Sequence, residues 1–537
     1  MIQSDNMAEP VDKKFKASSP APSRDVEDVV PGQTTSEVVL SKHGLRLHPQ
    51  PVVSDPLDPL NWSKLRKNSI LAIVMALYFM FTYITTTTVP SFPSLEEHYT
   101  LTIDQLNWTV AVPALGLSVG PLFWSSLADI YGRRPIFLIG TIIALASTVG
   151  AALAPDYGGY MAARFFQGFG VSPAASVGLA IINDCFFEME RGQKVGLWVL
   201  AIDLGLLAGP LIGGFVDLAG FVWIQWVTAI LFGVILVLEF FFLPETLYPR
   251  DLMLSKRTPV TATHGQSEKS AASSVSETSL PRTKTLPFLN YKPLPGMKHP
   301  SPMSTMWRFF KTFKFLAVPI AVITYCFGWY WWVLSVITLI PVAYETYSPQ
   351  SQGLLFLGLI IGTLISEVLC SGTLSDWLVV RLTKRNSGVK EPEMRLWLAY
   401  PAALISGVGL IVWGISVDRE WHWVVGQVGL VLFGAGIQMG NTAICSYIVD
   451  AYPLQSMAVI VFYSVMLNLS AFVDPFFIFP WVDTVGFTWT MAGHAIITVF
   501  FCIPALGLLH VFGGRIREKN GQPDWVNPEF DHDIVKE

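Results

Sequence analysis

The 537-residue sequence has few charged residues: Asp, Glu, Lys and Arg make up 14% of it, against about 25% in a typical soluble protein. Hydrophobic residues make up 52%. So few charges could not cover the surfaces of the roughly three or four soluble domains that this length allows. The excess of apolar side chains therefore indicates a protein that faces lipid.

Lysine and arginine are absent from four long stretches of the sequence. These stretches lie between Lys67 and Arg133, Lys194 and Arg250, Lys314 and Arg381, and Arg419 and Arg515. A helix needs about 20 mostly apolar residues to cross a bilayer, so each stretch can hold two or three spans. With the segments between the charged turns, the sequence predicts twelve spans, at residues 69–90, 107–127, 135–154, 160–183, 195–217, 223–243, 315–341, 352–373, 396–416, 421–448, 456–480 and 487–512.

Several kinds of site are also missing. The five cysteines lie in or beside apolar segments and form no C-x-x-C pair, and no histidine stands at ligand spacing (Cys185, Cys326, Cys370, Cys445 and Cys502). We therefore expect no disulfide framework, no metal site and no cofactor. The sequence has no nucleophile elbow and no phosphate-binding loop, which argues against an enzyme, and its net charge of −5 gives no sign of a nucleic-acid partner.

The polar segments divide the chain into five parts. We predict a disordered cytosolic tail at 1–68, six-helix bundles at 69–243 and 315–512, a cytosolic linker at 244–314 and a cytosolic tail at 513–537. With the N-terminus in the cytosol, all but two of the 35 Lys and Arg fall in cytosolic segments, as the positive-inside rule requires. The exceptions are Arg419, outside, and Arg164, within a span. The turn near Asp450 is the weak point, because it contains no base.

The two halves resemble each other weakly. Residues 125–129, Ser-Ser-Leu-Ala-Asp, follow the second span, and residues 372–376, Gly-Thr-Leu-Ser-Asp, follow the eighth. The fourth span ends in Asp184 and the tenth in Asp450. The predicted fold class is therefore an all-α membrane protein with twelve transmembrane helices in two pseudo-symmetric six-helix bundles.

The strongest motif joins the second and third spans: Ser125-x-Leu-Ala-Asp129-x-x-Gly132-Arg133-Arg134. It resembles the loop signature of the major facilitator superfamily, Gly-x-Leu-Ala-Asp-Arg-x-Gly-Arg-Lys/Arg, with Ser125 and Ile130 departing from the pattern. The resemblance implies a gating loop made of Asp129, Gly132, Arg133 and Arg134, with Asp376 as the counterpart in the second half. A charged turn that only fixes topology is the alternative.

Two further motifs resemble those of drug:proton exporters. Arg164-x-x-Gln167-Gly168, in the fourth span, is similar to a motif associated with proton transfer, although Arg164 could instead extend to the membrane surface. Gly205-x-x-x-Gly209-Pro210-x-x-Gly213-Gly214, in the fifth span, is similar to the antiporter signature, although small residues at this spacing also serve helix packing. The segment Pro244-Glu-Thr-Leu-Tyr-Pro-Arg250 is typical of the fungal twelve-span drug:proton antiporter branch.

Ionisable groups at membrane depth are candidates for proton coupling. A carboxyl in a dry setting can bind a proton in one conformation and release it in another. The candidates are Arg164, Asp203, Glu367 and Asp474, of which Asp203 and Glu367 are favoured. Helix packing is the alternative for each.

Polar and aromatic groups within the spans could form a cargo cavity. The candidates are Tyr83, Thr86, Gln167, Tyr325, Trp329, Trp332, Gln438 and Asn441. Aromatic faces with few fixed charges suit apolar or cationic organic molecules. The tryptophans could instead form an interfacial belt or contact lipid.

The resemblance implies a functional monomer that exports a small organic molecule in exchange for protons, at the plasma membrane or alternatively the vacuolar membrane. An importer of polyamines, organic cations or nutrients on the same fold is the main alternative, and a membrane-bound enzyme, a sensor or a channel is less consistent with paired six-span halves. Among the glycosylation sequons, only Asn107 is predicted to lie on the external side.

Overall fold

The computed structural model describes residues 49–52, 55–248, 250, 301–386, 389–452 and 455–521. Regular secondary structure in these ranges is entirely helical. Twelve helical segments are long and apolar enough to cross a membrane. The predicted all-α fold with twelve spans is confirmed.

The first half of the chain supplies six of these segments. Its elements are η1 (Pro59–Asn61), α1 (Lys64–Thr86), η2 (Val89–Ser91), α2 (Phe92–Tyr99), α3 (Ile103–Tyr131), α4 (Arg133–Ala152), α5 (Tyr157–Val171), α6 (Pro173–Cys185), α7 (Glu188–Val216), η3 (Asp217–Ala219) and α8 (Phe221–Phe242).

The second half supplies the other six. Its elements are α10 (Ser304–Thr312), α11 (Ala317–Tyr325), η4 (Cys326–Tyr330), α12 (Trp332–Ala343), α13 (Pro349–Leu355), α14 (Leu357–Ser366), η5 (Glu367–Leu374), α15 (Ser375–Arg385), η6 (Pro392–Leu398), α16 (Ala399–Asp418), α17 (Trp423–Ala451), α18 (Ser456–Val473), α19 (Pro475–Ile496), η8 (Ile497–Cys502) and α20 (Ile503–Asn520).

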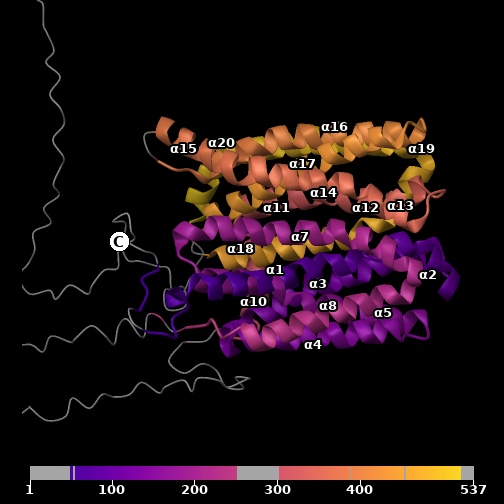
Figure 1. The fold of residues 1–537 in the computed structure, drawn as a ribbon. Helices are drawn as coiled ribbons and strands as arrows, with labels where there is room; N and C mark the ends of the chain where they lie inside the picture. The colour runs from indigo at the N-terminus through magenta and orange to yellow at the C-terminus, as the bar shows by residue number, and fades with distance from the viewer. Residues whose placement is uncertain are drawn as a thin grey trace, which may run out of the picture.

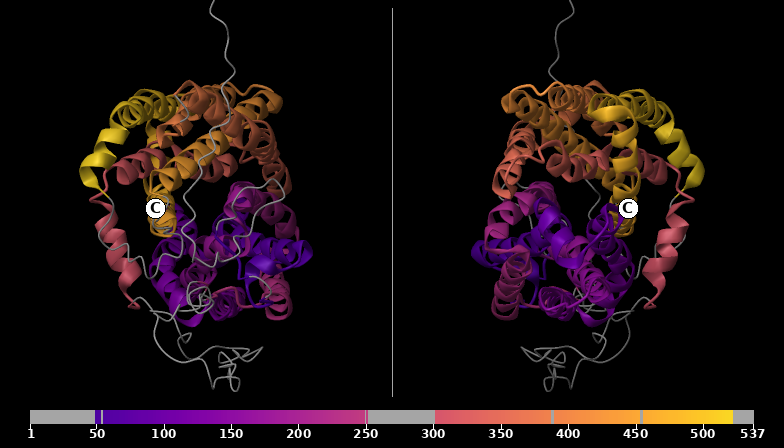
Figure 2. Two further views of the ribbon diagram at one scale, coloured as in Figure 1. Left: turned by 90° about the vertical axis from the view of Figure 1, so that its left-hand side faces the viewer. Right: turned by 90° about the vertical axis from the view of Figure 1, so that its right-hand side faces the viewer.

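The two halves lie side by side with their long helices aligned (Figure 1). Viewed along the helix axes, the indigo-to-magenta first half and the orange-to-yellow second half face each other (Figure 2). Helices α3 and α18 pack closely across the interface, and α7 packs against α13 and α14. We call the end at which α1 begins and α15 lies the linker end, and the end with α2 and α13 the opposite end (Figure 1).

Proline and π-helical turns divide several spans. Pro173 begins α6 and so divides the fourth span, because a proline has no N–H to continue the helix. The seventh, eighth and twelfth spans contain the π-helical turns η4, η5 and η8. Such turns free backbone carbonyls and are frequent at functional sites; η5 begins at Glu367.

The structure differs from the predicted domain boundaries at several places. Helix α1 begins at Lys64, where the Ser63 hydroxyl accepts a hydrogen bond from the Arg66 N–H, and residues 55–62 are folded against it. Helix α10 lies inside the predicted linker, and α20 continues to Asn520. The eleventh span ends at Val473, because Pro475 starts a new helix. The predicted disorder of 1–48 lies outside the described residues.

Candidate functional site

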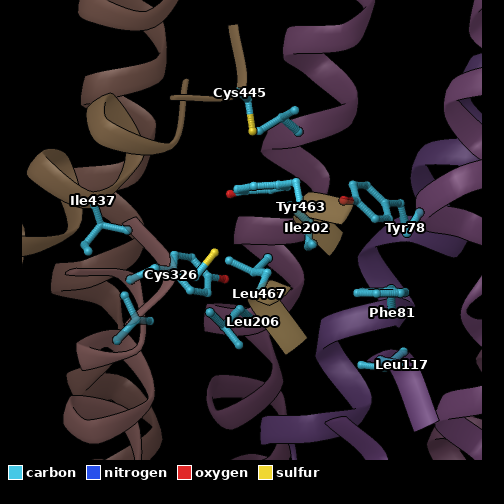
Figure 3. Packing of buried hydrophobic residues seen from close by; sticks show 14 of the residues in the cluster. Tyr78, Phe81, Leu117, Ile202, Leu206, Cys326, Ile437, Cys445, Tyr463 and Leu467 are labelled. Atoms are coloured by element: carbon cyan, nitrogen blue, oxygen red, sulfur yellow. The ribbon is translucent and has the colours of Figure 1, made fainter. Parts of the chain in front are cut away.

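A hydrogen bond joins the two halves inside the membrane. The Asn441 Nδ2 on α17 donates to the Asp203 Oδ2 on α7 at 2.9 Å. The Asn441 Oδ1 accepts from the Tyr463 hydroxyl at 2.6 Å and from the Cys445 thiol at 3.3 Å. Asp203 is 4% exposed, and its sequence neighbour Ile202 lies in a buried cluster that includes Tyr78, Cys445 and Tyr463 (Figure 3). Both the NH₂ group and the carbonyl oxygen of the Asn441 side chain are thus hydrogen-bonded.

A second carboxylate, Glu367 of η5, approaches the same faces of α7 and α17 as Asp203 and Asn441 occupy. The Gln438 Nε2 donates to the Glu367 Oε2 at 2.8 Å. Gln438 and Asn441 are three residues apart on α17 and therefore lie on one side of it. On α7, a Cβ added at Gly196 would lie 3.5 Å from the Glu367 Oε1, seven residues before Asp203. Two predicted carboxylates and two predicted amides thus form one row between α7 and α17.

The central cavity is almost closed in this conformation. It has a volume of about 10 Å³, which is room for about one water molecule. Its walls come from both halves: Thr82, Thr85, Val110, Ala114 and Leu206 from the first, and Tyr330, Leu334, Leu467, Asn468 and Ala471 from the second. An organic molecule does not fit in this cavity in the present conformation.

The glycine motif of α7 packs against α1. A Cβ at Gly205 would collide with the Phe79 carbonyl, one at Gly209 with the Thr86 hydroxyl and one at Gly213 with the Thr87 carbonyl. Beside these glycines, the Thr82 hydroxyl donates to the Ile202 carbonyl at 2.5 Å and the Thr86 hydroxyl to the Leu206 carbonyl at 2.8 Å. Small residues four apart allow this close approach.

The last glycine of the motif faces the other half. A Cβ at Gly214 would collide with the Pro349 carbonyl of α13 and lie 3.2 Å from the Gly353 Cα. Pro210 lies in the interior of α7, and its carbonyl would be 3.2 Å from a Cβ at Gly353. The motif therefore seals α7 against α1 within its own half and against α13 across the interface, at the opposite end of the bundle.

Arg164 is fully buried within the first half. Its Nη1 donates to the Gln167 Oε1 at 2.7 Å and its Nη2 to the Thr109 carbonyl at 3.0 Å. Gln167 donates in turn to the Thr148 hydroxyl at 2.8 Å and to the Gln225 Oε1 at 3.4 Å. The Arg164 Nε has no hydrogen-bond partner among the described residues. The side chain is held inside the bundle rather than extended to the membrane surface.

Asp474 lies between α18 and α19, where the Ser335 hydroxyl of α12 donates to its Oδ1 at 2.5 Å. Its Oδ2 is buried and has no partner among the described residues. The other intramembrane acid, Glu239, accepts from the Thr141 hydroxyl at 3.0 Å. The structure therefore does not bring Asp474 into the row formed by Asp203 and Glu367.

The predicted gating loop forms a charge cluster at the linker end. Arg133 pairs with Asp129, and its Nε lies 3.4 Å from the Asp184 Oδ2. Gly132, with φ 107°, makes the turn between α3 and α4, and its left-handed backbone suits glycine. The Glu245 carboxylate accepts from the backbone N–H groups of Arg133 and Arg134 at 2.9 and 3.2 Å, at the start of α4.

The second half has a matching cluster. The Arg395 Nε lies 2.7 Å and the Lys390 Nζ 3.0 Å from the Asp450 Oδ2, and the Arg395 Nη1 donates to the Ser375 hydroxyl at 3.3 Å. Asp450, whose own turn contains no Lys or Arg, thus forms ion pairs with two basic side chains from another turn. The side chain of Asp376, the predicted second-half counterpart of Asp129, lies outside the described residues, whereas the neighbouring Ser375 takes part in the cluster.

The segments before α1 and after α8 fold onto each other. The Arg250 Nη2 lies 3.2 Å from the Asp58 Oδ1, and the Tyr248 hydroxyl donates to the Asp55 Oδ2 at 2.5 Å. Burial, together with the neighbouring Asp55 carboxylate, raises the pKa of Tyr248, which keeps its hydroxyl a donor. Residues 244–248 and Arg250 therefore belong to the packed structure of the linker end.

Several predicted cavity residues lie in packed surroundings. Trp329 donates to the Ser406 hydroxyl at 3.0 Å, and Trp332 stacks on His494 with 3.8 Å between ring centroids, both inside the second half. Tyr325 donates to the Ile437 carbonyl at 3.3 Å and stacks with Tyr463.

The remaining predicted polar groups are also packed. Tyr83 stacks with Phe79 along α1, and Thr86 lies in the contact between α1 and α7. Asn107 is 3% exposed, so the side chain of the predicted external sequon is buried in this conformation.

Sequence reasoning missed Tyr463, Cys445 and Ser335, which bind the candidate carboxylates or their partners. Each stands in an apolar span, where tyrosine, cysteine and serine are common and carry no distinct spacing signal. The approach of α18 and α12 in three dimensions brings Tyr463 and Ser335 to the site, whereas Cys445 stands four residues after Asn441 on α17.

Comparisons with known proteins agree with this architecture. The profile of the Major Facilitator Superfamily matches residues 71–475. The chain is 28% identical to the probable efflux pump mfs2 of Aspergillus flavus, over 80% of this chain and 98% of that protein. It is 28% identical to the efflux pump radE of Floropilus chiversii, over 86% of this chain and 83% of that protein.

A solved structure shows the same fold. The xylose transporter XylE from E. coli, in a partially occluded inward-open conformation, matches with a TM-score of 0.57 at 15% identity, over 84% of this chain and 98% of that chain. The predicted resemblance to the family is confirmed, and the relatives are transporters rather than enzymes. With its twelve spans, the chain is an integral membrane transporter of the major facilitator superfamily.

Proposed function

We propose that the chain is a proton-coupled antiporter that exports small organic molecules, with its tails and linker in the cytosol and the plasma membrane as its site of action. One copy is sufficient, because the row of polar residues forms within a single chain. The observation that carries the proposal is the hydrogen bond between Asp203 and Asn441, which joins the two halves beside a cavity lined by both.

The bond provides a link between protonation and conformation. An anionic carboxylate is costly to bury unless partners compensate its charge, and Asp203 has such a partner only while α7 and α17 are together. Separation of the halves breaks this contact and lets water reach the carboxylate. Binding or release of a proton at Asp203 therefore favours one conformation over the other, as exchange between two sides requires.

Glu367 extends the same argument, because its partner Gln438 stands on the same face of α17. Arg164 has a different task in this proposal: it organises the polar core of the first half through Gln167 and Thr109. The cavity lined by both halves has aromatic and aliphatic walls, including Tyr330 and Leu206, which suit an apolar or cationic organic molecule.

The test uses inside-out membrane vesicles that contain the full chain, an imposed pH gradient and a panel of fluorescent organic compounds. We expect gradient-driven accumulation of at least one compound, and its loss in Asp203→Asn. Asp483→Asn, the same change at an exposed aspartate, is the matched control and retains transport. Full coupled transport in Asp203→Asn contradicts the role of Asp203, and accumulation only in vesicles of the opposite orientation indicates an importer.

A further inference from the structure

Helix α10 has one face that packs against the protein. Thr305, Phe309 and Thr312 are buried at i, i+4 and i+7, which places them on one side of the helix. The Ser126 hydroxyl of α3 accepts a hydrogen bond from the Thr305 N–H at 3.1 Å and lies 2.5 Å from the Thr305 hydroxyl. This contact attaches the start of α10 to the first half.

The other end of α10 contacts the second half. The ring centroids of Phe309 and Phe462 are 5.2 Å apart, and those of Phe313 and Phe462 are 5.0 Å apart. Phe462 belongs to α18. Helix α10 therefore bridges α3 and α18 at the linker end, and it lies at the margin of the molecule, across the direction of the spanning helices (Figure 2, pink).

The outward face of α10 is apolar. Met303, Trp307 and Phe310 are 45%, 65% and 57% exposed, and their i, i+4, i+7 spacing puts them in one stripe. A tryptophan and a phenylalanine exposed on a short helix beside spanning helices are typical of an element that lies in the membrane interface.

Basic residues accompany this stripe. Arg308, Lys311 and Lys314 stand on or directly after α10, and Lys311 and Lys314 are exposed. Between Glu277 and Glu345 the sequence contains no acidic residue, whereas it contains seven bases from Arg282 to Lys314. A run of bases directly before a spanning helix is attracted to anionic lipid headgroups.

We propose that α10 docks on anionic phospholipids of the adjacent membrane leaflet. The stripe of Met303, Trp307 and Phe310 enters the boundary between headgroups and acyl chains, and the three bases bind the lipid phosphates and carboxylates. Because α10 contacts both α3 and α18, the docked helix connects the lipid surface to both halves of the transporter. The charge complementarity and the exposed aromatic stripe select a lipid surface as the occupant.

The test measures which lipid surrounds α10 in the full-length protein. A fluorophore is attached through Met303→Cys, and single proteins are placed in phosphatidylcholine nanodiscs with trace amounts of nitroxide-labelled phosphatidylserine or phosphatidylcholine. Unmutated protein taken through the same labelling gives the background from native cysteines. We expect the anionic lipid to quench the fluorophore at least about threefold more efficiently than the neutral lipid. Salt at about 0.5 M screens exposed charges and should therefore reduce this ratio.

Matched variants distinguish the lipid preference of the α10 bases from a general effect of positive charge at this end of the protein. Arg308→Gln/Lys311→Gln/Lys314→Gln brings the quenching ratio to about 1 if the bases carry the preference. Arg381→Gln/Lys384→Gln/Arg385→Gln, which removes three exposed bases from α15 at the same end, leaves the ratio unchanged. Lys314→Glu alone serves if the triple variant fails to fold. Equal quenching by both lipids in the unmutated chain, or a ratio that survives the α10 changes, overturns the proposal.

Discussion

The Asp203 carboxylate on α7 and the Asn441 amide on α17 form a 2.9 Å hydrogen bond across the interface between the two halves of the transporter. The two residues are 238 positions apart in the sequence. Rocking of the halves against each other must break this bond, so the energy of the bond enters the equilibrium between closed and open conformations.

Asn441→Ala should shift this equilibrium toward conformations with separated halves. Loss of a hydrogen bond to a buried carboxylate costs about 1–3 kcal/mol, which corresponds to a population shift of about 5- to 150-fold. The native thiol of Cys445, which is buried next to Asn441, reports the change through its rate of maleimide labelling, located by mass spectrometry.

The matched control for this change is Asn468→Ala. The Asn468 amide donates to the Ser464 carbonyl on its own helix, so this hydrogen bond does not connect the two halves. Its Cys445 labelling should equal that of the unmutated chain. Equal labelling in Asn441→Ala as well would show that the bond does not hold the halves together.

Gly209→Val should destabilise the protein, because the added atoms collide with Thr86 and the Tyr83 carbonyl on α1. Overpacking of this kind costs about 1–3 kcal/mol. The midpoint of thermal unfolding in detergent should fall, and aggregation during purification should increase.

Gly233→Val on α8 is the control for this prediction, since a Cβ at Gly233 meets nothing within 4 Å. Its unfolding midpoint should stay close to that of the unmutated protein. If both variants unfold together, the contact between α1 and α7 is looser than its glycines indicate.

Gly132→Ala should cost more stability than Gly220→Ala. The two glycines have φ values of 107° and 106°, so both substitutions impose a similar backbone strain, about 1–3 kcal/mol. Only at Gly132 does the new Cβ also collide with the Glu245 carboxylate, whereas it meets open space at Gly220. The difference between the two unfolding midpoints measures the contact between the turn at Gly132 and Glu245, and equal midpoints would exclude it.

Arg164→Lys should reduce transport of a cargo found in the vesicle assay by about tenfold, because a lysine cannot reproduce the two directed bonds of the guanidinium to Gln167 and Thr109. The folded protein should remain in the membrane, as checked by gel filtration. Arg419→Lys, at an arginine that lies over the Trp421 ring at the end of α16, keeps the charge in the same way and should leave transport unchanged. Unimpaired transport in Arg164→Lys would show that only the positive charge at this position matters and that the directed bonds of the guanidinium do not.

Much of the architecture could be predicted from residues that act locally. The twelve spans follow from apolar length, and Gly132 predicts its turn because few other residues adopt its backbone conformation. Tyr463 and Ser335 could not be predicted as site residues, because their importance depends on helices that approach from distant parts of the chain. The amides Gln438 and Asn441 could be found as polar exceptions in an apolar span, but their carboxylate partners could not be assigned.

The sequence by itself determined that this protein crosses a membrane twelve times, because scarce charge and apolar length have no other solution in a lipid environment. It also singled out Arg164, Asp203 and Asp474, which are buried, together with Glu367, which is partly buried. Only the tertiary structure decided how these groups pair: Asp203 with Asn441, Glu367 with Gln438, and Arg164 within its own half. The physical reason is that hydrogen bonds between helices depend on rotation and crossing, which emerge only when all the helices pack together.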